Sequence, residues 1–437
     1  STASQIIAFD PESAEARAII PEEERIKGTT VVYRDMDGKV YGQNGGQWYV
    51  LYEGEAGKID KPETRNEKPI ITSSQNLFHA QFPDGKVLKR CDLVERSMIV
   101  EDPATGESKE FGIEYTSEGA HIMGVAAAPD GTICGGTAFP MRFFSYNPET
   151  DEWINRASYG QWNTVARQGD RYFVGGYGGG FLLEWDPARE WVATEKGDEA
   201  GNPRFLTQCT PTIHRPHDLL AHPDGKTLVL AGTPGYGYTG GGLLFWDRET
   251  QTESLIEHTA ILPNQSTLSL VALPERKLLG GATTGAGTGG EQLAGEAELY
   301  IMDMETKEVL WHEAVFPGVQ GYTDLCLASK GLVYGVADQK RFFIFEPKAR
   351  QVVLDRDLEA EFGLTTSQQG PRVFVTDLDG VVYMLFVKGV ARIDSDTHAI
   401  TMLAESPVEV GPGGDFHNGR IYFGSGSHLY SYEVPGN

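Results

Sequence analysis

The chain has 437 residues and a composition that favours β-structure, since it contains 53 Gly, 23 Pro, 18 Tyr and 20 Phe, whereas helical solenoids are rich in Leu, Ala and Lys. Its formal net charge of −25 leaves no basic excess to neutralise the phosphates of nucleic acid or an anionic membrane. No apolar run approaches the roughly 18 residues of a transmembrane helix, so we expect neither a nucleic-acid partner nor membrane insertion.

A polar turn between two apolar runs recurs along the whole chain. In chain order its copies are MDGKVYG at Gly38, PDGKVL at Gly85, PDGTICGG at Gly131, QGDRYFVGG at Gly169, PDGKTLVLAG at Gly225, PERKLLGG at Glu275, SKGLVYG at Gly331, LDGVVYM at Gly380 and HNGRIYFG at Gly419. Their mean spacing is about 48 residues. Asp-Gly and Asn-Gly supply the positive φ values that tight hairpin turns require. The pattern therefore predicts nine β-hairpins.

An aromatic-rich strand and a short final strand follow these hairpins. The aromatic strands include residues 143–150, 182–189, 243–250, 299–306 and 342–349, and residues 350–354 exemplify the final strand. Four strands in a unit of about 48 residues are typical of a propeller blade. The sequence therefore predicts an all-β fold, a single closed β-propeller domain over residues 1–437, with nine blades favoured and eight as the next count.

The two ends of the chain carry complementary parts of one unit. Residues 6–13 have the aromatic-strand pattern with no hairpin before it, and the last unit, from Arg420, ends before a fourth strand. We therefore expect the N-terminal strands to complete the last blade, which closes the ring without a free sheet edge.

The PDG turns and the aromatic third strands resemble those of the broad group of NHL, YVTN and lactonase-type propellers. The resemblance covers most of the chain and implies the architecture, but it transfers no functional residue. The WD and GH dipeptides that mark WD40 blades do not recur as a set.

The residues that begin the innermost strands form the candidate site, because these strand starts surround one mouth of a propeller's central channel. The layer is more polar than the strands that follow it. It comprises Gln75, Asn76, Ala120, His121, Ile122, Trp162, Asn163, Arg215, Pro216, His217, Ser266, Thr267, Gly321, Tyr322 and Thr323. Such a mouth could hydrogen-bond hydroxyls and stack on sugar rings.

The densest constellation in this layer is His214, Arg215, His217 and Asp218. Histidines that exchange protons near neutral pH, with a carboxylate beside them, could act as general acid and base. The same groups could ligate Zn²⁺ or Mn²⁺. The structural alternative is that they hydrogen-bond to neighbouring blades.

Two further features add candidate residues. His121 occupies an equivalent place in an earlier unit, and Arg142 could hold a carboxylate bidentately or pair with a surface acid. Glycine-rich inserts at 175–181, 232–243 and 282–298 join second and third strands. Glycine lets such loops approach a ligand or a neighbouring backbone closely, and Tyr177, Tyr236 and Tyr238 in them are stacking candidates.

Three functions stay open at this point. The residue types resemble those of propeller polysaccharide lyases, which use His or Tyr as acid and base and Arg or a metal to neutralise a uronate carboxylate. The resemblance implies an enzyme with catalytic His121, His217 and Tyr238, and with substrate-binding Arg142, Trp162, Tyr177, Arg215, Tyr236 and Tyr322. The first alternative is a non-catalytic propeller that binds carbohydrate or protein, and the second is a lactonase-type metal hydrolase.

The remaining expectations concern partners, cofactor and location. We expect a monomer with a carbohydrate or small-molecule ligand at the channel mouth, in a secreted or periplasmic setting. No cofactor is assigned, and a divalent metal stays open. The four cysteines lie far apart without a CxxC spacing, so structural thiols are expected, with a disulfide or metal site as the alternative.

Overall fold

The computed structural model describes residues 6–10, 13, 15–26, 30–35, 38–62, 82, 84–92, 96–112, 114, 119–138, 140–197, 200–367, 370 and 372–435. By its contacts the chain divides into two compact units, Ala3–Glu118 and Gly119–Asn437, the latter with Ser1–Thr2. The regular secondary structure of the described residues in both units is almost entirely antiparallel β-strand.

The larger unit contains six four-stranded sheets and one three-stranded sheet among its described residues. The strands of the first three sheets are β10 (His121–Ala127), β11 (Ile133–Ala138), β12 (Arg142–Asn147) and β13 (Glu152–Ala157); β14 (Gln161–Gln168), β15 (Arg171–Tyr177), β16 (Phe181–Trp185) and β17 (Arg204–Gln208); β18 (Arg215–Ala221), β19 (Thr227–Thr233), β20 (Gly242–Asp247) and β21 (Thr252–Glu257). Each sheet orders its strands as the chain does, so neighbouring strands of a sheet are consecutive in the chain.

The other four sheets follow in the same way. Their strands are β22 (Ser266–Leu273), β23 (Lys277–Thr283), β24 (Leu299–Asp303) and β25 (Val309–Glu313); β26 (Tyr322–Leu327), β27 (Val333–Ala337), β28 (Arg341–Glu346) and β29 (Gln351–Asp357); β30 (Phe374–Thr376), β31 (Val382–Phe386), β32 (Gly389–Ile393) and β33 (Ile400–Glu405); β34 (Gly414–His417), β35 (Arg420–Ser425) and β36 (His428–Glu433). The short helices η2 (His258–Ala260), η3 (Ser329–Gly331) and α1 (Glu359–Phe362) lie in the connections.

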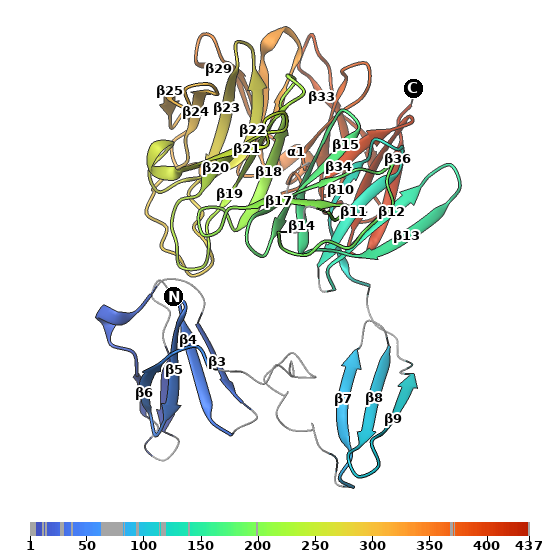
Figure 1. The fold of residues 1–437 in the computed structure, drawn as a ribbon. Helices are drawn as coiled ribbons and strands as arrows, with labels where there is room; N and C mark the ends of the chain where they lie inside the picture. The colour runs from blue at the N-terminus through green and yellow to red at the C-terminus, as the bar shows by residue number, and fades with distance from the viewer. Residues whose placement is uncertain are drawn as a thin grey trace. The chain divides into compact units, whose positions relative to one another are not determined.

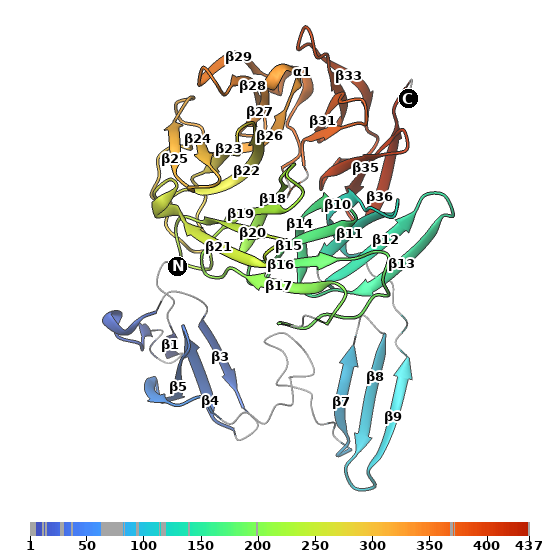
Figure 2. The ribbon, with the colours of Figure 1, turned by 45° about the horizontal axis from the view of Figure 1, so that its top comes forward.

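These seven sheets form a closed ring. The first strand of each sheet packs against the first strand of the next, from β10 through β14, β18, β22, β26 and β30 to β34, and β34 and β35 pack against β10 (Figures 1 and 2). Apolar side chains fill the space between adjacent sheets: Phe342 and Ile344 of one sheet share a cluster with Met384 and Phe386 of the next. The larger unit is therefore a seven-bladed β-propeller.

The smaller unit also contains blade-like sheets. Its strands are β1 (Ile7–Asp10) and β2 (Glu15–Ala18); β3 (Thr30–Arg34), β4 (Val40–Asn44), β5 (Gln47–Tyr52) and β6 (Glu55–Ile59); β7 (Val87–Asp92), β8 (Ser97–Asp102) and β9 (Glu107–Gly112). The short helix η1 (Glu22–Glu24) connects β2 to β3. Ile6, Ile20 and Tyr49 form a small core on the β3–β6 sheet.

The predicted all-β propeller with repeating hairpins is confirmed, and all nine predicted turn positions have positive φ. The values are 82° at Gly38, 87° at Gly85, 84° at Gly131, 61° at Gly169, 77° at Gly225, 61° at Glu275, 75° at Gly331, 80° at Gly380 and 75° at Gly419. Nine sheets of three or four strands accompany the nine turns. Seven of them make the ring of the larger unit, and one domain over residues 1–437 stays a prediction.

The expected completion of the last blade by the N-terminal strands differs from the observed topology. β1 pairs with β2 in a hairpin of its own, with Ile7 opposite Ala18, and the last sheet consists of β34, β35 and β36. The ring closes instead where the last sheet packs against the first. A hydrogen bond links the two sheets there, from the Ala127 amide to Asp415 Oδ2 at 2.9 Å. β1 pairs with a strand a few residues away, and closing that short loop costs much less conformational entropy than pairing with the last blade would.

A β-bulge near the start of the inner strands sets up these contacts between blades. The register shifts at the same place in five inner strands, between Ile122 and Gly124, Trp162 and Thr164, Pro216 and Asp218, Thr267 and Ser269, and Tyr322 and Asp324. A bulge re-aims the side chains beside it. In the third and fifth sheets the residue after the bulge is an aspartate that bonds to the next inner strand.

Candidate functional site

Four side chains from neighbouring blades meet at one rim of the ring. The His214 ring lies edge-on to Tyr177, with ring centroids 5.2 Å apart, and edge-on to Tyr236, at 5.3 Å. The hydroxyls of Tyr177 and Tyr236 are hydrogen-bonded to each other. The Arg215 guanidinium lies over the Tyr177 ring, 5.1 Å from its centroid, as in a cation–π contact. We call Tyr177, His214, Arg215 and Tyr236 the rim cluster.

Strand ends and glycine-rich loops position the rim cluster. Tyr177 ends β15, His214 directly precedes β18, and Arg215 begins it. After Tyr177 the chain turns so tightly that a Cβ on Gly180, which has φ +61°, would lie 2.0 Å from the Ile213 carbonyl oxygen. Only glycine fits such an approach between two backbones.

The second and third glycine-rich inserts hold Tyr236 in place by packing on each other. The Gly237 amide donates to the Thr288 carbonyl at 3.0 Å, and the Gly287 amide donates to the Tyr238 carbonyl at 3.0 Å. A Cβ on Gly287 would lie 2.1 Å from the carbonyl oxygen of Gly235. The glycines therefore let the two long loops pack closely against each other. Together these loops form one side of the site.

The electrostatics of the cluster keep it neutral apart from Arg215. Burial and then the Arg215 charge lower the pKa of His214, so its imidazole is uncharged at neutral pH. The hydrogen bond to Tyr177 and then burial raise the pKa of Tyr236, so it stays a hydroxyl. Arg215 is thus the one cation of the cluster, beside two phenol hydroxyls and an imidazole.

The cleft between these groups is narrow. Its lining also includes Thr233, Pro234, Ala286, Gly287 and Thr288, and its cavity volume is about 20 Å³, which is room for about one water. A larger ligand must therefore lie across the half-buried rings and Arg215, or separate the two tyrosines.

His217 lies deeper on β18 and contacts other groups. Its Nε2 is 3.1 Å from Thr233 Oγ1, and its carbonyl accepts bonds from the Gly370 amide and from Arg372 Nη2, each at 2.8 Å. Burial, then Arg372 and Arg215, lower the pKa of His217 to about 3. It is therefore neutral and firmly held, as in the structural alternative drawn from the sequence.

The other proposed catalytic residues lie elsewhere. His121 begins β10 and is exposed, opposite Ala138 of β11. Arg142 begins β12 and its Nε donates to Asn155 Oδ1 at 3.0 Å. Tyr238 is in the same loop as Tyr236 but does not line the cleft. The structure thus does not gather His121, His217, Arg142 and Arg215 into one pocket.

Two proposed substrate-binding rings prove to be core residues, which corrects the sequence interpretation. Trp162 is 1% exposed and stacks with Phe143 at a centroid distance of 4.1 Å. Tyr322 is 0% exposed and packs beside Phe343. Trp162 is the second residue of β14 and Tyr322 is the first of β26, and side chains at the start of an inner strand point between the sheets as readily as toward the mouth. Gln75 and Asn76 lie outside the described residues.

Sequence reasoning missed Arg372 altogether. It is 1% exposed, and its Nη2 donates to the carbonyls of His217 and Leu268, at 2.8 Å and 2.7 Å, while its Nε lies 4.0 Å from Asp324 Oδ1. Arg372 lies just before β30, the first strand of the sixth sheet, and its side chain thus contacts the third, fourth and fifth blades. An isolated arginine before a β-strand carries no local pattern that could have indicated this role.

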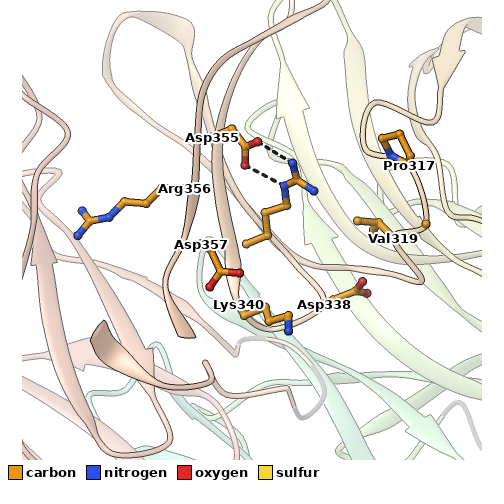
Figure 3. A pocket seen from close by; sticks show the side chains of 9 residues that line it. Pro317, Val319, Asp338, Lys340, Asp355, Arg356 and Asp357 are labelled. Carbon is orange, nitrogen blue, oxygen red and sulfur yellow. Dashed lines mark hydrogen bonds and ion pairs between the residues drawn. The ribbon is translucent and has the colours of Figure 1, made fainter. Parts of the chain in front are cut away.

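A second cavity, of about 400 Å³, lies beside β28 and β29. Its lining is charged, with Asp338, Lys340, Arg356 and Asp357 around it (Figure 3). Arg341 and Asp355 form a bidentate pair there at 2.8 Å and 2.6 Å. The pairing uses up the guanidinium edge that would otherwise bind an anionic ligand.

Three further observations concern metals, thiols and membranes. In the part of the chain that the structure describes, no group of three or more His, Cys, Asp or Glu side chains could hold a metal ion. Cys91, Cys134, Cys209 and Cys326 are free thiols, as the sequence indicated. Among the described residues no helix has the length and apolar character to cross a membrane.

The fold and the rim cluster define a β-propeller, and comparison with known proteins agrees on the fold. The β-propeller domain of Cps50 (Swd1) from Myceliophteria thermophila is similar to this chain with a TM-score of 0.52 and 14% identity, over 73% of this chain and 99% of that one. A computationally designed protein, Ika8, gives a TM-score of 0.44 at 14% identity, over 78% and 91%. At such identity the likeness to Cps50 shows the fold alone. No protein-family model and no curated protein matches the chain.

Proposed function

We propose that the propeller binds an acidic carbohydrate across the rim cluster and does not turn it over. The observation that carries the proposal is the convergence of two tyrosine rings, an imidazole and one guanidinium at a single cleft. Aromatic faces stack on sugar rings, the hydroxyls and imidazole match sugar hydroxyls, and Arg215 can pair with a uronate carboxylate.

Binding is favoured over lyase chemistry because the predicted catalytic residues, His121, His217 and Tyr238, do not line the cleft of the rim cluster. A general base must lie within hydrogen-bond reach of the proton that it takes. His217 contacts Thr233 instead, and a pKa of about 3 makes it a weak base. His121 lies on the first sheet, whereas the cluster belongs to the second and third.

The proposal extends to the finer features of the sequence interpretation. In architecture we place this chain beside the NHL, YVTN and lactonase-type propellers. We further propose that the protein is a monomer and that it is secreted or periplasmic. We assign no cofactor, because ligand binding at the cluster uses side chains alone.

Titration calorimetry with a tetrasaccharide of galacturonate and the matching neutral galactose tetrasaccharide tests the proposal. Arg215→Ala should weaken uronate binding by about tenfold to a hundredfold, since a charged hydrogen bond is lost, and should change neutral-sugar binding little. Tyr236→Ala should weaken both by about threefold to tenfold.

Tyr238→Phe, in the same loop but outside the cleft, is the matched control and should bind like the parent. Parent protein that binds neither sugar would refute the proposal. A steady rise in ultraviolet absorbance with the uronate would instead reveal a lyase.

A further inference from the structure

A second groove of the propeller lies at its outer edge and shares no residue with the rim cluster. It runs between α1 on one side and the β31–β32 turn, β33 and the segment after β33 on the other, and its volume is about 570 Å³. Cavities of a few hundred Å³ accommodate drug-sized ligands or a few side chains. Every residue of its lining is described by the structure.

The floor of the groove is apolar. Phe362 is 7% exposed and stacks on Phe386 at a centroid distance of 5.2 Å. Half-buried Met402, Val387 and Val408 continue the floor. Methionine adapts its shape to different partners, so this floor can accept an apolar side chain without a fixed outline.

The rim of the groove is acidic. Glu359, Glu361, Glu405 and Glu409 line it, with Lys388 as the one cation of the lining. Glu359 pairs with Lys340 at 2.6 Å, and Glu361 pairs with Arg356. Neither Glu405 nor Glu409 forms an ion pair with any residue that the structure describes. When Lys340 and Arg356 are counted together with Lys388, the four glutamates still leave the groove with one excess negative charge.

This distribution differs from that of the cavity in Figure 3. There Arg341 and Asp355 neutralise each other in a bidentate pair. In the groove, the exposed carboxylates of Glu405 and Glu409 stand beside an apolar floor and form no ion pair with a described residue, although Lys388 is part of the lining. Exposed pairs such as Lys340–Glu359 contribute little and exchange partners readily, which leaves further carboxylates open to an incoming cation.

We propose that the groove binds a basic peptide segment of a partner protein, with an apolar side chain on the floor and flanking Lys or Arg side chains at Glu405 and Glu409. Charge complementarity selects this occupant, because the acidic rim repels anionic ligands such as nucleic acid or the proposed uronate. The chain's net charge of −25 also draws basic segments toward the protein.

Fluorescence polarisation with three labelled decapeptides tests the groove. The first alternates Lys and Arg around two central Leu residues, the second replaces both Leu by Gly, and the third replaces all basic residues by Glu. The full-length protein should bind the first peptide most tightly and the third not at all. Its affinity for the first peptide should fall steeply with added salt.

Variants locate the binding site. Glu405→Lys combined with Glu409→Lys should weaken binding by about tenfold, whereas Glu313→Lys, an exposed reversal on β25, should weaken it far less. Met402→Ala should weaken it and Met402→Leu should restore it. Far-ultraviolet circular dichroism confirms that each variant is folded.

The proposal is overturned if the parent binds none of the peptides. Equal loss of affinity in Glu313→Lys and in the double variant also overturns it, because binding would then follow the total charge and not the groove. If the peptide with Gly in place of both Leu residues binds as tightly as the first peptide, the apolar floor does not contribute to binding.

Discussion

At the residue scale, buried Arg372 and half-buried His217 connect the inner strands of neighbouring blades. Arg372 bonds to the carbonyl of His217 and lies near Asp324. Burial also raises the pKa of Asp218 to about 6. Several ionisable groups of the inner strands thus have folded-state pKa values that depart from those of the unfolded chain, and such departures make stability depend on pH.

His217 should destabilise the fold in acid. Its folded-state pKa is lowered to about 3, whereas the unfolded chain takes up the proton near pH 6.5. Stability from the neutral imidazole is therefore full above about pH 6.5 and is lost as pH falls toward 3. Between about pH 7.5 and pH 5 the parent should lose up to about 2 kcal/mol more unfolding free energy than His217→Gln.

Urea unfolding of both proteins at the two pH values measures this difference. The raised pKa of Asp218 acts in the opposite direction, because protonation favours the folded state as pH falls. That contribution is common to parent and variant and cancels in the comparison. Parallel pH dependences in the two proteins would show that His217 titrates normally.

Single residues also show where sequence reasoning reached its limit. Tyr177, Tyr236 and Arg215 were predicted as ligand-binding residues and do come together, since glycine-rich loops and a strand start can be read from the sequence. Trp162 and Tyr322 occupy comparable strand starts but face the core. Both lie one register position further along the inner strand than Arg215, and successive side chains of a strand point to opposite faces.

At the element scale, three aspartates link consecutive inner strands in the same way. Asp218 Oδ2 accepts from the Leu270 amide at 2.7 Å, Asp324 Oδ2 accepts from the Val373 amide at 3.0 Å, and Asp415 Oδ2 accepts from Ala127 at 2.9 Å. The other carboxylate oxygen of each accepts from the amide of the following residue. Each aspartate therefore ties its own strand to the next blade.

Asp415→Ala should weaken ring closure. The change leaves the Ala127 and Phe416 amides without their acceptor, and a buried unpaired donor costs about 1–3 kcal/mol. Asp396→Ala is the control, because that carboxylate is 83% exposed in its pair with Lys330 and should contribute less than about 1 kcal/mol. Guanidinium unfolding measures both, and equal losses would rule out a special role for Asp415.

The loop after Tyr177 should tolerate no side chain at Gly180. Alanine there needs φ near +61° and a Cβ 2.0 Å from the Ile213 carbonyl oxygen, so the backbone must move, at about 2–4 kcal/mol. Gly295→Ala should be nearly neutral, because no heavy atom lies within 4 Å of its Cβ. Thermal unfolding tests the pair, and a stable Gly180→Ala would mean that the loop is not fixed as described.

The repeating elements could be predicted because turn chemistry is local. Glycine after Asp or Asn adopts positive φ at no steric cost and so favours tight turns, and all nine turn positions have positive φ. The partner of an edge strand cannot be read from its own pattern, because the same pattern suits a local partner and a distant one. Residues 6–13 therefore looked like a missing strand of the last blade, whereas β1 pairs with β2.

At the scale of the whole molecule, the spacing of the turns predicted nine units, and the described residues form nine sheets of three or four strands besides the β1–β2 hairpin. The number of blades in a closed ring depends on the angle between adjacent sheets, which side-chain packing sets. In residues 119–437 seven sheets suffice to bring β34 against β10. The repeat length alone holds no information about that angle.

The central claim is that the rim cluster of this ring holds an acidic sugar. A crystal structure of the full-length protein with the galacturonate tetrasaccharide tests it most directly. We expect one sugar ring over Tyr177 or Tyr236, with its carboxylate at Arg215. A sugar ordered elsewhere on the protein, with the rim cluster unchanged and empty at saturating ligand, would contradict the claim.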